Sequence, residues 1–300
     1  MGKKKQRIDP APVESPYLVP FDESWKLRKA STKPPKKAPQ GKKGKGENKA
    51  ALAECVKEIY ELQRKLFAED KFSLLLVFQA MDAAGKDGTI RAVMTGINPA
   101  GCQVSSFKRP SSEELDHDFL WRIGQRMPER GRIGIFNRSH YEEVLVVRVN
   151  PGILKSQRLP SISDHIWDER YASIRNFEEH AARNGTVVRK FFLNVSKGEQ
   201  KDRLLARIDD ERKNWKFEAG DLDARDQWDD YMKAYEKALN ETSRPWAPWY
   251  AIPADDKPFM RRTVADIVRR TLESMPIAFP TLNREQQAKL QEHRKRLEAS

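Results

Sequence analysis

Residues 80–87, AMDAAGKD, combine small residues, two carboxylates and a lysine at a spacing that suits phosphate binding. A run of large apolar residues precedes them, and a helical pattern begins at Lys86. A buried strand that leads through a tight turn into a helix N-terminus is a P-loop, in which backbone N–H groups and the helix dipole hold phosphate oxygens. Lys86 would reach the phosphates. The predicted phosphate-binding residues of this loop are Ala83, Ala84, Gly85, Asp87, Gly88 and Thr89.

The loop departs from the ordinary P-loop pattern at two positions, because Ala80 replaces the first glycine and Asp87 the final Ser or Thr. A strand-to-helix turn that binds nothing is the alternative interpretation. Asp82 and Asp87 would repel phosphate unless a divalent cation lay between carboxylate and phosphate. The sequence therefore predicts Mg²⁺ as cofactor, with Mn²⁺ as its substitute.

A second segment, GIFNRS at residues 134–139, reads as a buried strand that ends in polar residues. P-loop enzymes carry a metal-binding Asp at this position, and here it is Asn137. Arg138 suits charge neutralisation on a transferring phosphoryl group. A strand exit with a surface ion pair is the alternative. The predicted metal ligands are Asp82, Asp87 and Asn137, and the predicted catalytic residues are Asp82, Lys86, Asn137, Arg138 and Glu143.

Further cations lie where phosphates would collect. Lys108 and Arg109 follow a predicted strand, at the sheet edge where ligands bind. Arg203 and Arg207 are four residues apart and share one helical face. Solvated charge is the usual interpretation of such a face, but an upstream P-loop favours a lid that closes cations over phosphates. The remaining predicted phosphate-binding cations are Arg122, Arg212 and Lys216.

Strands alternate with helices along the chain, which predicts an α/β fold of three layers, with a parallel central sheet covered by helices on both faces. The predicted strands are 72–79, 103–107, 132–136, 186–193 and 249–252. The predicted helices include 50–68, 86–97, 113–127, 164–184 and 259–275. A polar helical insert at about 200–230 has the position and composition of a mobile lid.

Charge and composition divide the chain into three parts. Residues 1–49 hold 14 Lys or Arg against five Asp or Glu, and most of the net charge of +12 lies there. This segment is predicted to be a basic, largely flexible arm, followed by a kinase domain at 50–280 and a charged helix at 281–300. No apolar run is long enough to cross a bilayer, and no signal sequence is evident, so the expected location is the cytoplasm. Specific nucleic-acid binding is not expected.

Six blocks of sequence resemble the polyphosphate kinase 2 family: MDAAGKDGTI, ELDHDFLWR, IGIFNRSHYEEVLVVRV, ERKNWKF, WDDYMKAYEKAL and APWYAIPAD. The resemblance covers roughly residues 50–275. It implies a thymidylate-kinase-like fold with a helical lid, and reversible Mg²⁺-assisted phosphoryl transfer between inorganic polyphosphate and nucleoside mono- or diphosphates. It also implies a homo-oligomer, a dimer or a tetramer.

The family's motifs fall on particular residues of this chain. Its Walker A residues correspond to Asp82, Lys86 and Asp87, its Walker B residues to Asn137 and Arg138, and its lid cations to Arg203, Arg207 and residues 212–216. Asn137 replaces the Asp of many members, and the His-Tyr-Glu-Glu that follows resembles the class III subgroup, which phosphorylates AMP as well as ADP. Two alternatives stay open: an ATP-dependent nucleotide kinase of thymidylate-kinase type, and a non-catalytic polyanion-binding protein.

Overall fold

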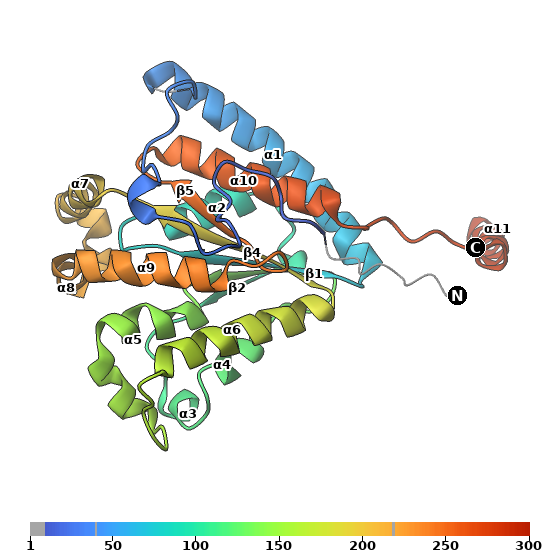
Figure 1. Ribbon diagram of the computed structural model, residues 1–300. Helices are drawn as coiled ribbons and strands as arrows, with labels where there is room; N and C mark the ends of the chain where they lie inside the picture. The colour runs from blue at the N-terminus through green and yellow to red at the C-terminus, as the bar shows by residue number, and fades with distance from the viewer. Residues whose placement is uncertain (1–9, 40, 218–219) are drawn as a thin grey trace.

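The computed structural model describes residues 10–39, 41–217 and 220–300 (Figure 1). Within these residues, five parallel strands form one central sheet in the order β2-β3-β1-β4-β5. The strands are β1 (Ser73–Gln79), β2 (Cys102–Ser106), β3 (Ile133–Asn137), β4 (Thr186–Asn194) and β5 (Trp249–Pro253). Every residue of β1 is buried, because the central strand is covered on both faces. The predicted parallel sheet is confirmed.

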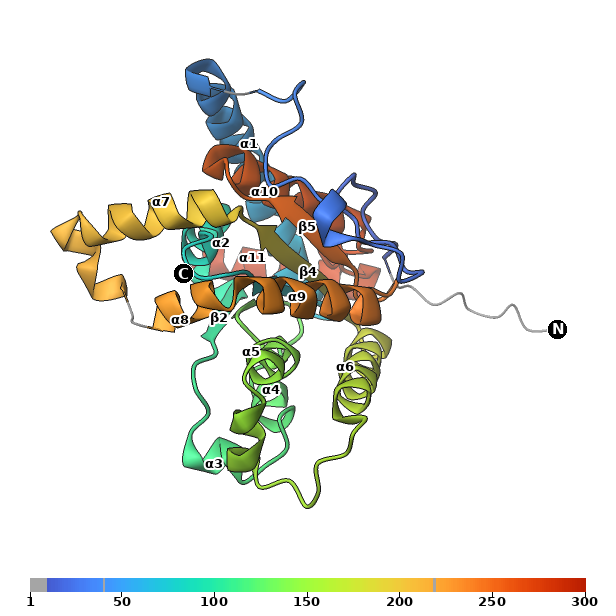
Figure 2. The same ribbon diagram turned by 60° about the vertical axis from the view of Figure 1, so that its left-hand side comes forward.

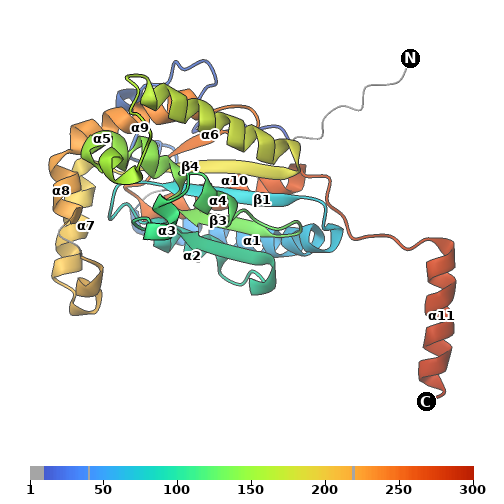
Figure 3. The same cartoon turned by 90° about the horizontal axis from the view of Figure 1, so that it is seen from below.

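Helices cover both faces of the sheet (Figures 1 and 3). On one face lie α1 (Gly41–Glu69), α2 (Lys86–Met94) and α10 (Lys257–Ser274). On the other lie α6 (Ile166–Arg183) and α9 (Trp228–Thr242), with the short helices α3 (Ser112–Leu115), α4 (Trp121–Gly124) and α5 (Val146–Val149). Short 3-10 helices occupy Leu27–Lys29, Pro99–Gly101, His140–Val144 (η3) and Pro151–Gln157. The three-layer α/β/α architecture is as the sequence predicted, although the helix expected at 113–127 is two short ones.

The predicted lid segment leaves the body at the carboxyl end of β4. It consists of α7 (Lys197–Ile208), a 3-10 helix (Glu211–Lys216) and α8 (Gly220–Asp226). Figure 2 shows α7 extending away from the sheet on the side where α2 begins. Leu205, Ile208 and Trp215 are exposed on it. The segment therefore stands beside the P-loop with apolar surface uncovered, as expected for an element that closes over a ligand.

The N-terminal segment packs on the body. Val13 and Val19 are buried, the Val19 N–H donates to the Trp249 carbonyl at 2.9 Å, and the Ala251 N–H donates to the Tyr17 carbonyl at 2.8 Å. These bonds add an extended segment beside the edge strand β5, which corrects the prediction of a largely flexible arm for residues 10–39. Residues 1–9 lie outside the described part.

The boundaries predicted at the two ends of the kinase domain also differ from the structure. Helix α1 begins at Gly41, nine residues before the predicted start, so the division after residue 49 falls inside a helix. At the other end, α11 (Arg284–Glu298) stands apart from the body, with all its residues exposed (Figure 3). Among the described residues, no helix is both long and apolar enough to cross a membrane.

Candidate phosphoryl-transfer site

The loop between β1 and α2 has the backbone of a phosphate cradle. Ala83 and Gly85 adopt positive φ angles of 62° and 107°, which turn the chain sharply into the N-terminus of α2. Lys86 lies in the first turn of that helix, and its Nζ donates to the Ala80 carbonyl at 2.8 Å. Burial lowers the pKa of Lys86, and the nearby Asp82 acts in the opposite direction. Lys86 is thus held at the base of the loop, where a phosphate oxygen could replace the Ala80 carbonyl.

The exit of β3 meets this loop because β3 pairs with β1, with Asn137 beside Phe78. Arg138 has φ 62°, and its N–H donates to the Phe78 carbonyl at 3.1 Å. Its Nη2 donates to Asp82 Oδ1 at 2.8 Å, which brings together two of the predicted catalytic residues. Burial alone would lower the pKa of Arg138, but Glu142 and Asp82 outweigh it and raise that pKa. Arg138 is a permanent cation beside the loop.

Of the two consecutive glutamates in η3, the structure places Glu142 at the site. Its carboxylate lies 3.9 Å from Arg138 Nη1, and burial raises the pKa of Glu142 against the opposing effect of Arg138. The Glu143 side chain points to the other side and pairs with buried Arg170 of α6 at 2.8 Å. The prediction of Glu143 as a catalytic residue is therefore corrected to Glu142. The two neighbouring side chains point in different directions, and the sequence alone does not show which of two adjacent glutamates faces the site.

Two of the three predicted metal ligands, Asp87 and Asn137, lie in contact with each other. Asn137 Nδ2 donates to Asp87 Oδ1 at 2.8 Å, and both side chains border a hollow of about 450 Å³ between α2 and β2. Asn137 Oδ1 is buried without a hydrogen-bond partner. In the part of the chain that the structure describes, no three His, Cys, Asp or Glu side chains gather as a metal cage. Mg²⁺ is commonly held by one or two carboxylates together with substrate phosphates and water, so these residues fit it.

The cations after β2 differ in their exposure. Lys108 and Arg109 are exposed on the loop at the carboxyl end of β2, where they can meet a ligand. Arg122 is buried instead: its Nη1 donates to the Lys108 carbonyl at 2.9 Å, and its guanidinium lies 5.5 Å from the centre of the Phe107 ring. Arg122 therefore holds the loop that carries Lys108 rather than presenting its own charge.

The lid cations are engaged within the protein. Arg203 is buried and donates to the carbonyls of Ala84 and Ala254, both at 2.6 Å, so it fastens α7 to the P-loop and to the end of β5. Arg207 pairs with Asp221 at 3.0 Å, and Arg212, which is exposed, pairs with Asp210 at 3.0 Å. The side chain of Lys216 lies outside the described residues.

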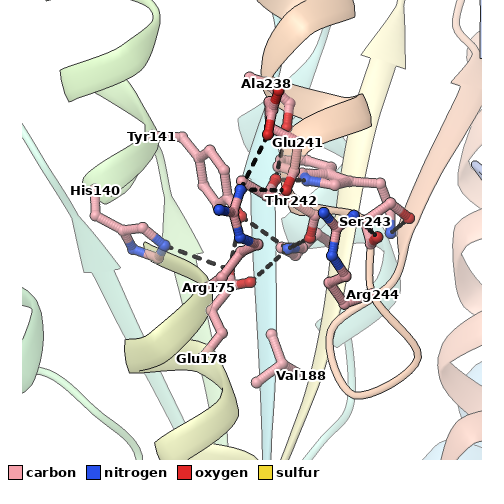
Figure 4. A network of polar contacts seen from close by, with 12 residues as sticks. His140, Tyr141, Arg175, Glu178, Val188, Ala238, Glu241, Thr242, Ser243 and Arg244 are labelled. Atoms are coloured by element: carbon pink, nitrogen blue, oxygen red, sulfur yellow. Dashed lines mark hydrogen bonds and ion pairs between the residues drawn. The ribbon is translucent and has the colours of Figure 1, made fainter. Parts of the chain in front are cut away.

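A buried polar network behind the site was not predicted (Figure 4). Lys190 Nζ donates to Glu178 at 2.6 Å, to the Tyr141 hydroxyl at 2.7 Å and to the Thr242 carbonyl at 2.8 Å. Tyr141 also donates to Glu178 at 2.8 Å, and His140 lies 3.4 Å from the same carboxylate. One feature of the sequence could have predicted this network. Lys190 lies in the middle of an apolar strand, and a fully buried ammonium group needs a counter-charge. The network anchors η3, the segment that follows Arg138.

This arrangement defines a class of protein. A parallel sheet in the order β2-β3-β1-β4-β5, a lysine at a P-loop after β1, and an arginine at the exit of the adjacent β3 together define a P-loop kinase fold. A family model described as polyphosphate kinase 2 matches residues 42–280, and the chain therefore belongs to the polyphosphate kinase 2 family.

Several known proteins are similar to this chain. An ADP-polyphosphate phosphotransferase of Rhodopseudomonas palustris is 57% identical over 75% of this chain and 79% of its own length. An AMP/ADP-polyphosphate phosphotransferase of Meiothermus ruber is 46% identical over 77% of this chain and 83% of its own. The crystal structure of polyphosphate kinase 2 from Arthrobacter aurescens TC1 superposes with a TM-score of 0.83 at 37% identity, covering 95% of this chain and 99% of that one.

Proposed function

We propose that this protein transfers the terminal phosphoryl group of inorganic polyphosphate to ADP and AMP, reversibly and with Mg²⁺. The observation that carries the proposal is the meeting of Lys86, Asp82 and Arg138 at one point of the sheet edge. The names of the relatives from Rhodopseudomonas palustris and Meiothermus ruber agree with it, the first for ADP and the second for both acceptors.

The acceptor is itself a phosphate, so its attacking oxygen is already ionised near neutral pH and needs no general base. A bond forms between this oxygen and the terminal phosphorus of polyphosphate, and the bond from that phosphorus to the bridging oxygen breaks. Catalysis then consists of alignment and charge neutralisation. Lys86 and the loop N–H groups would hold the transferring group, and Arg138 would balance its charge from the side of β3.

When bound, Mg²⁺ would supply positive charge between the phosphates, held by Asp87, with Asp82 and Asn137 nearby. Asp82 has a second task, since its hydrogen bond fixes the guanidinium of Arg138. Lys108 and Arg109 lie on the β2 side of the loop and would bind the acceptor nucleotide's phosphates.

The remaining proposals concern assembly and location. We expect a homo-oligomer of two or four copies in the cytoplasm. Size-exclusion chromatography with light scattering tests the first, and cell fractionation tests the second.

The test of the proposed function supplies polyphosphate and Mg²⁺ with ADP, AMP, GMP or GDP in parallel, without ATP, and resolves the products by chromatography. We expect ATP from ADP and ADP from AMP. Absence of both products, with phosphoryl transfer from ATP to a nucleoside monophosphate present, would establish the ATP-dependent nucleotide kinase instead. Lys86→Ala is expected to abolish turnover. Polyphosphate binding without turnover in the wild-type protein would favour the non-catalytic alternative.

A further inference from the structure

The N-terminal segment reaches the base of the lid as well as the edge of the sheet. Residues 10–39, called the strap below, run along β5 and then past the end of the sheet from which α7 projects (Figure 1). There Asn194 Nδ2, at the end of β4, donates to the carbonyls of Ala30 and Ser31 at 3.2 and 3.3 Å. Helix α7, the first helix of the lid, begins at Lys197. The strap is therefore held beside the point where the lid leaves the body.

One residue of the turn after β5, Asp255, joins the strap to the lid. Its Oδ1 accepts from the Ser196 N–H at 2.8 Å, and its Oδ2 accepts from the Thr32 hydroxyl at 2.8 Å. Its own N–H donates to the Thr32 carbonyl at 2.9 Å. Ser196 is the N-cap of α7, and its hydroxyl accepts from the Glu199 N–H at 3.1 Å. The two oxygens of one carboxylate are thus divided between the strap and the N-cap of the lid helix.

The base of α7 in turn holds the backbone of the P-loop. Gln200, which is fully buried, donates from Nε2 to the Asp82 carbonyl at 3.1 Å. Arg203, on the same face of α7, donates to the Ala84 carbonyl at 2.6 Å and to the Asp255 carbonyl at 3.2 Å. A tilt of α7 about its N-terminus would therefore move two carbonyls of the phosphate cradle.

We propose that Asp255 is a positioning residue for phosphoryl transfer, and that Thr32 orients it. The contacts form one chain, from the strap through Asp255 to the N-terminus of α7, and from α7 to the P-loop. Both residues act through α7 and not on the reacting atoms. The proposal rests on the proposed function and adds to it the element that sets the geometry of the loop.

The location of these bonds favours positioning over a purely structural role. Asp255, Thr32 and Ser196 are each partly exposed, so water can satisfy the groups that a substitution leaves without a partner, and the loss of folding free energy is small. The outer half of α7 exposes Leu205 and Ile208, so little packing fixes the direction of the helix there. Loss of the Asp255 bonds should therefore change the orientation of α7 more than the stability of the fold.

The test compares Asp255→Ala and Thr32→Val by hydrogen exchange and by steady-state kinetics with polyphosphate and ADP. A hydrogen bond to a charged group corresponds to roughly a tenfold to hundredfold change in an equilibrium constant. We expect amide exchange in the first turn of α7 and at Ala84 to become about tenfold faster in both variants, with the amides of β1 and β4 unchanged. We expect kcat to fall about tenfold and KM for ADP to change less than about twofold, because alignment is disturbed and acceptor binding is not.

Conservative variants test whether the hydrogen bonds themselves are the cause. Thr32→Ser keeps the hydroxyl group. Asp255→Asn keeps an oxygen for the Ser196 N–H and gains an amide N–H that can donate to the Thr32 hydroxyl oxygen. Both variants should retain exchange rates and kcat within about threefold of the wild type. Conservative variants that are as impaired as Thr32→Val and Asp255→Ala would refute the inference.

The neighbouring residue supplies a matched control. Asp256 Oδ1 accepts from the Phe259 N–H at 2.8 Å and caps α10, so Asp256→Ala loses a bond of the same kind and length without touching α7. It should lower the melting temperature, as loss of a helix cap does, and leave exchange in α7 and kcat unchanged. The same fall in kcat in Asp256→Ala as in Asp255→Ala would show that general destabilisation explains both, and the positioning role would be wrong.

The inference and the proposed function can fail separately, because hydrogen exchange needs no substrate. Wild-type protein that makes no ATP from polyphosphate and ADP would refute the proposed function, whereas faster exchange in α7 and at Ala84 of Asp255→Ala would still support the link from the strap to the P-loop. Wild-type turnover, together with normal exchange and a kcat within about twofold of the wild type in Asp255→Ala, would refute the role of Asp255 alone.

Discussion

Lys190 offers the sharpest test of how the fold supports the site. It lies in the middle of β4, fully buried, and its three hydrogen bonds join Glu178 of α6, Tyr141 of η3 and Thr242 at the end of α9. Lys190→Met keeps the length of the side chain and removes the charge. The Glu178 carboxylate, which is 2% exposed, then remains in the interior without its cation.

The expected cost follows from this burial. Breaking a buried ion pair by removing one partner costs about 3–5 kcal/mol, because the other charge stays desolvated and unpaired. For a protein of 300 residues, whose entropy of unfolding is about 0.6 kcal/mol/K, that corresponds to a fall in melting temperature of roughly 5–8 °C. Glu178→Gln/Lys190→Met removes both charges and leaves a neutral amide in place of Glu178, which can still accept from Tyr141. We therefore expect the double variant to be more stable than Lys190→Met alone.

The pH dependence gives a second measurement of the same effect. Burial would raise the pKa of Glu178, but Lys190 and His140 outweigh it and hold that pKa below its ordinary value of 4.5. A carboxylate with a lowered folded-state pKa contributes stability above its unfolded-state pKa. Without Lys190, burial dominates and the pKa of Glu178 rises, so the variant loses stability as pH rises from about 4.5. The deficit should therefore be small near pH 4.5 and grow toward neutrality.

Urea unfolding of the wild type, Lys190→Met, Glu178→Gln and the double variant at pH 5, 6 and 7 measures these free energies. The window stays below pH 8 because burial lowers the pKa of Lys190 to about 8. A deficit under about 1 kcal/mol for Lys190→Met at pH 7 would refute the reasoning. So would a double variant whose destabilisation equals the sum of the two single variants, because coupled charges should not be additive.

The remaining predictions concern the site itself. Arg138→Ala should lower kcat about a thousandfold with little change in melting temperature, as for other arginines that balance phosphoryl charge, and steady-state kinetics checks this. Glu142→Gln should lower kcat, whereas Glu143→Gln should mainly lower the melting temperature by leaving Arg170 unpaired; the reverse pattern would contradict the assignment of Glu142 to the site. Arg203→Met should destabilise the P-loop, seen as faster hydrogen exchange at Ala84. Chelation of divalent cations should abolish turnover, and either Mg²⁺ or Mn²⁺ should restore it.

The sequence predicted the fold well where a residue pattern is compatible with only one local structure. The apolar run at 72–79 has to be a strand covered on both faces, and the small residues before Lys86 permit only a sharp turn into a helix. The ends of the kinase domain were harder. Glycine and lysine at residues 41–49 predict a flexible segment, yet α1 begins at Gly41. Helix α1 packs along α10, and this tertiary contact outweighs the low intrinsic propensity of its first turns.

The same distinction explains which of the predicted site residues the structure brings together. Asp82, Lys86 and Arg138 lie within segments whose backbone fixes the direction of the side chain, so their place in the chain predicted their place in the site. Glu143, Arg122 and Arg203 were predicted without knowledge of their partners, and in the structure each is paired inside the protein. Charge in a sequence does not reveal whether the fold brings a partner to it.

Arg261 shows the converse. Nothing in the sequence of α10 marks it out, since Arg262 beside it and the Arg269-Arg270 pair further along look alike. Only the packed structure separates the arginine whose side chain has no described partner from the three that have one, and places it on Gly88. The surroundings of Arg261 therefore come from the packing of α10 on α2, whereas the backbone geometry of the loop and of the β3 exit follows from the local sequence.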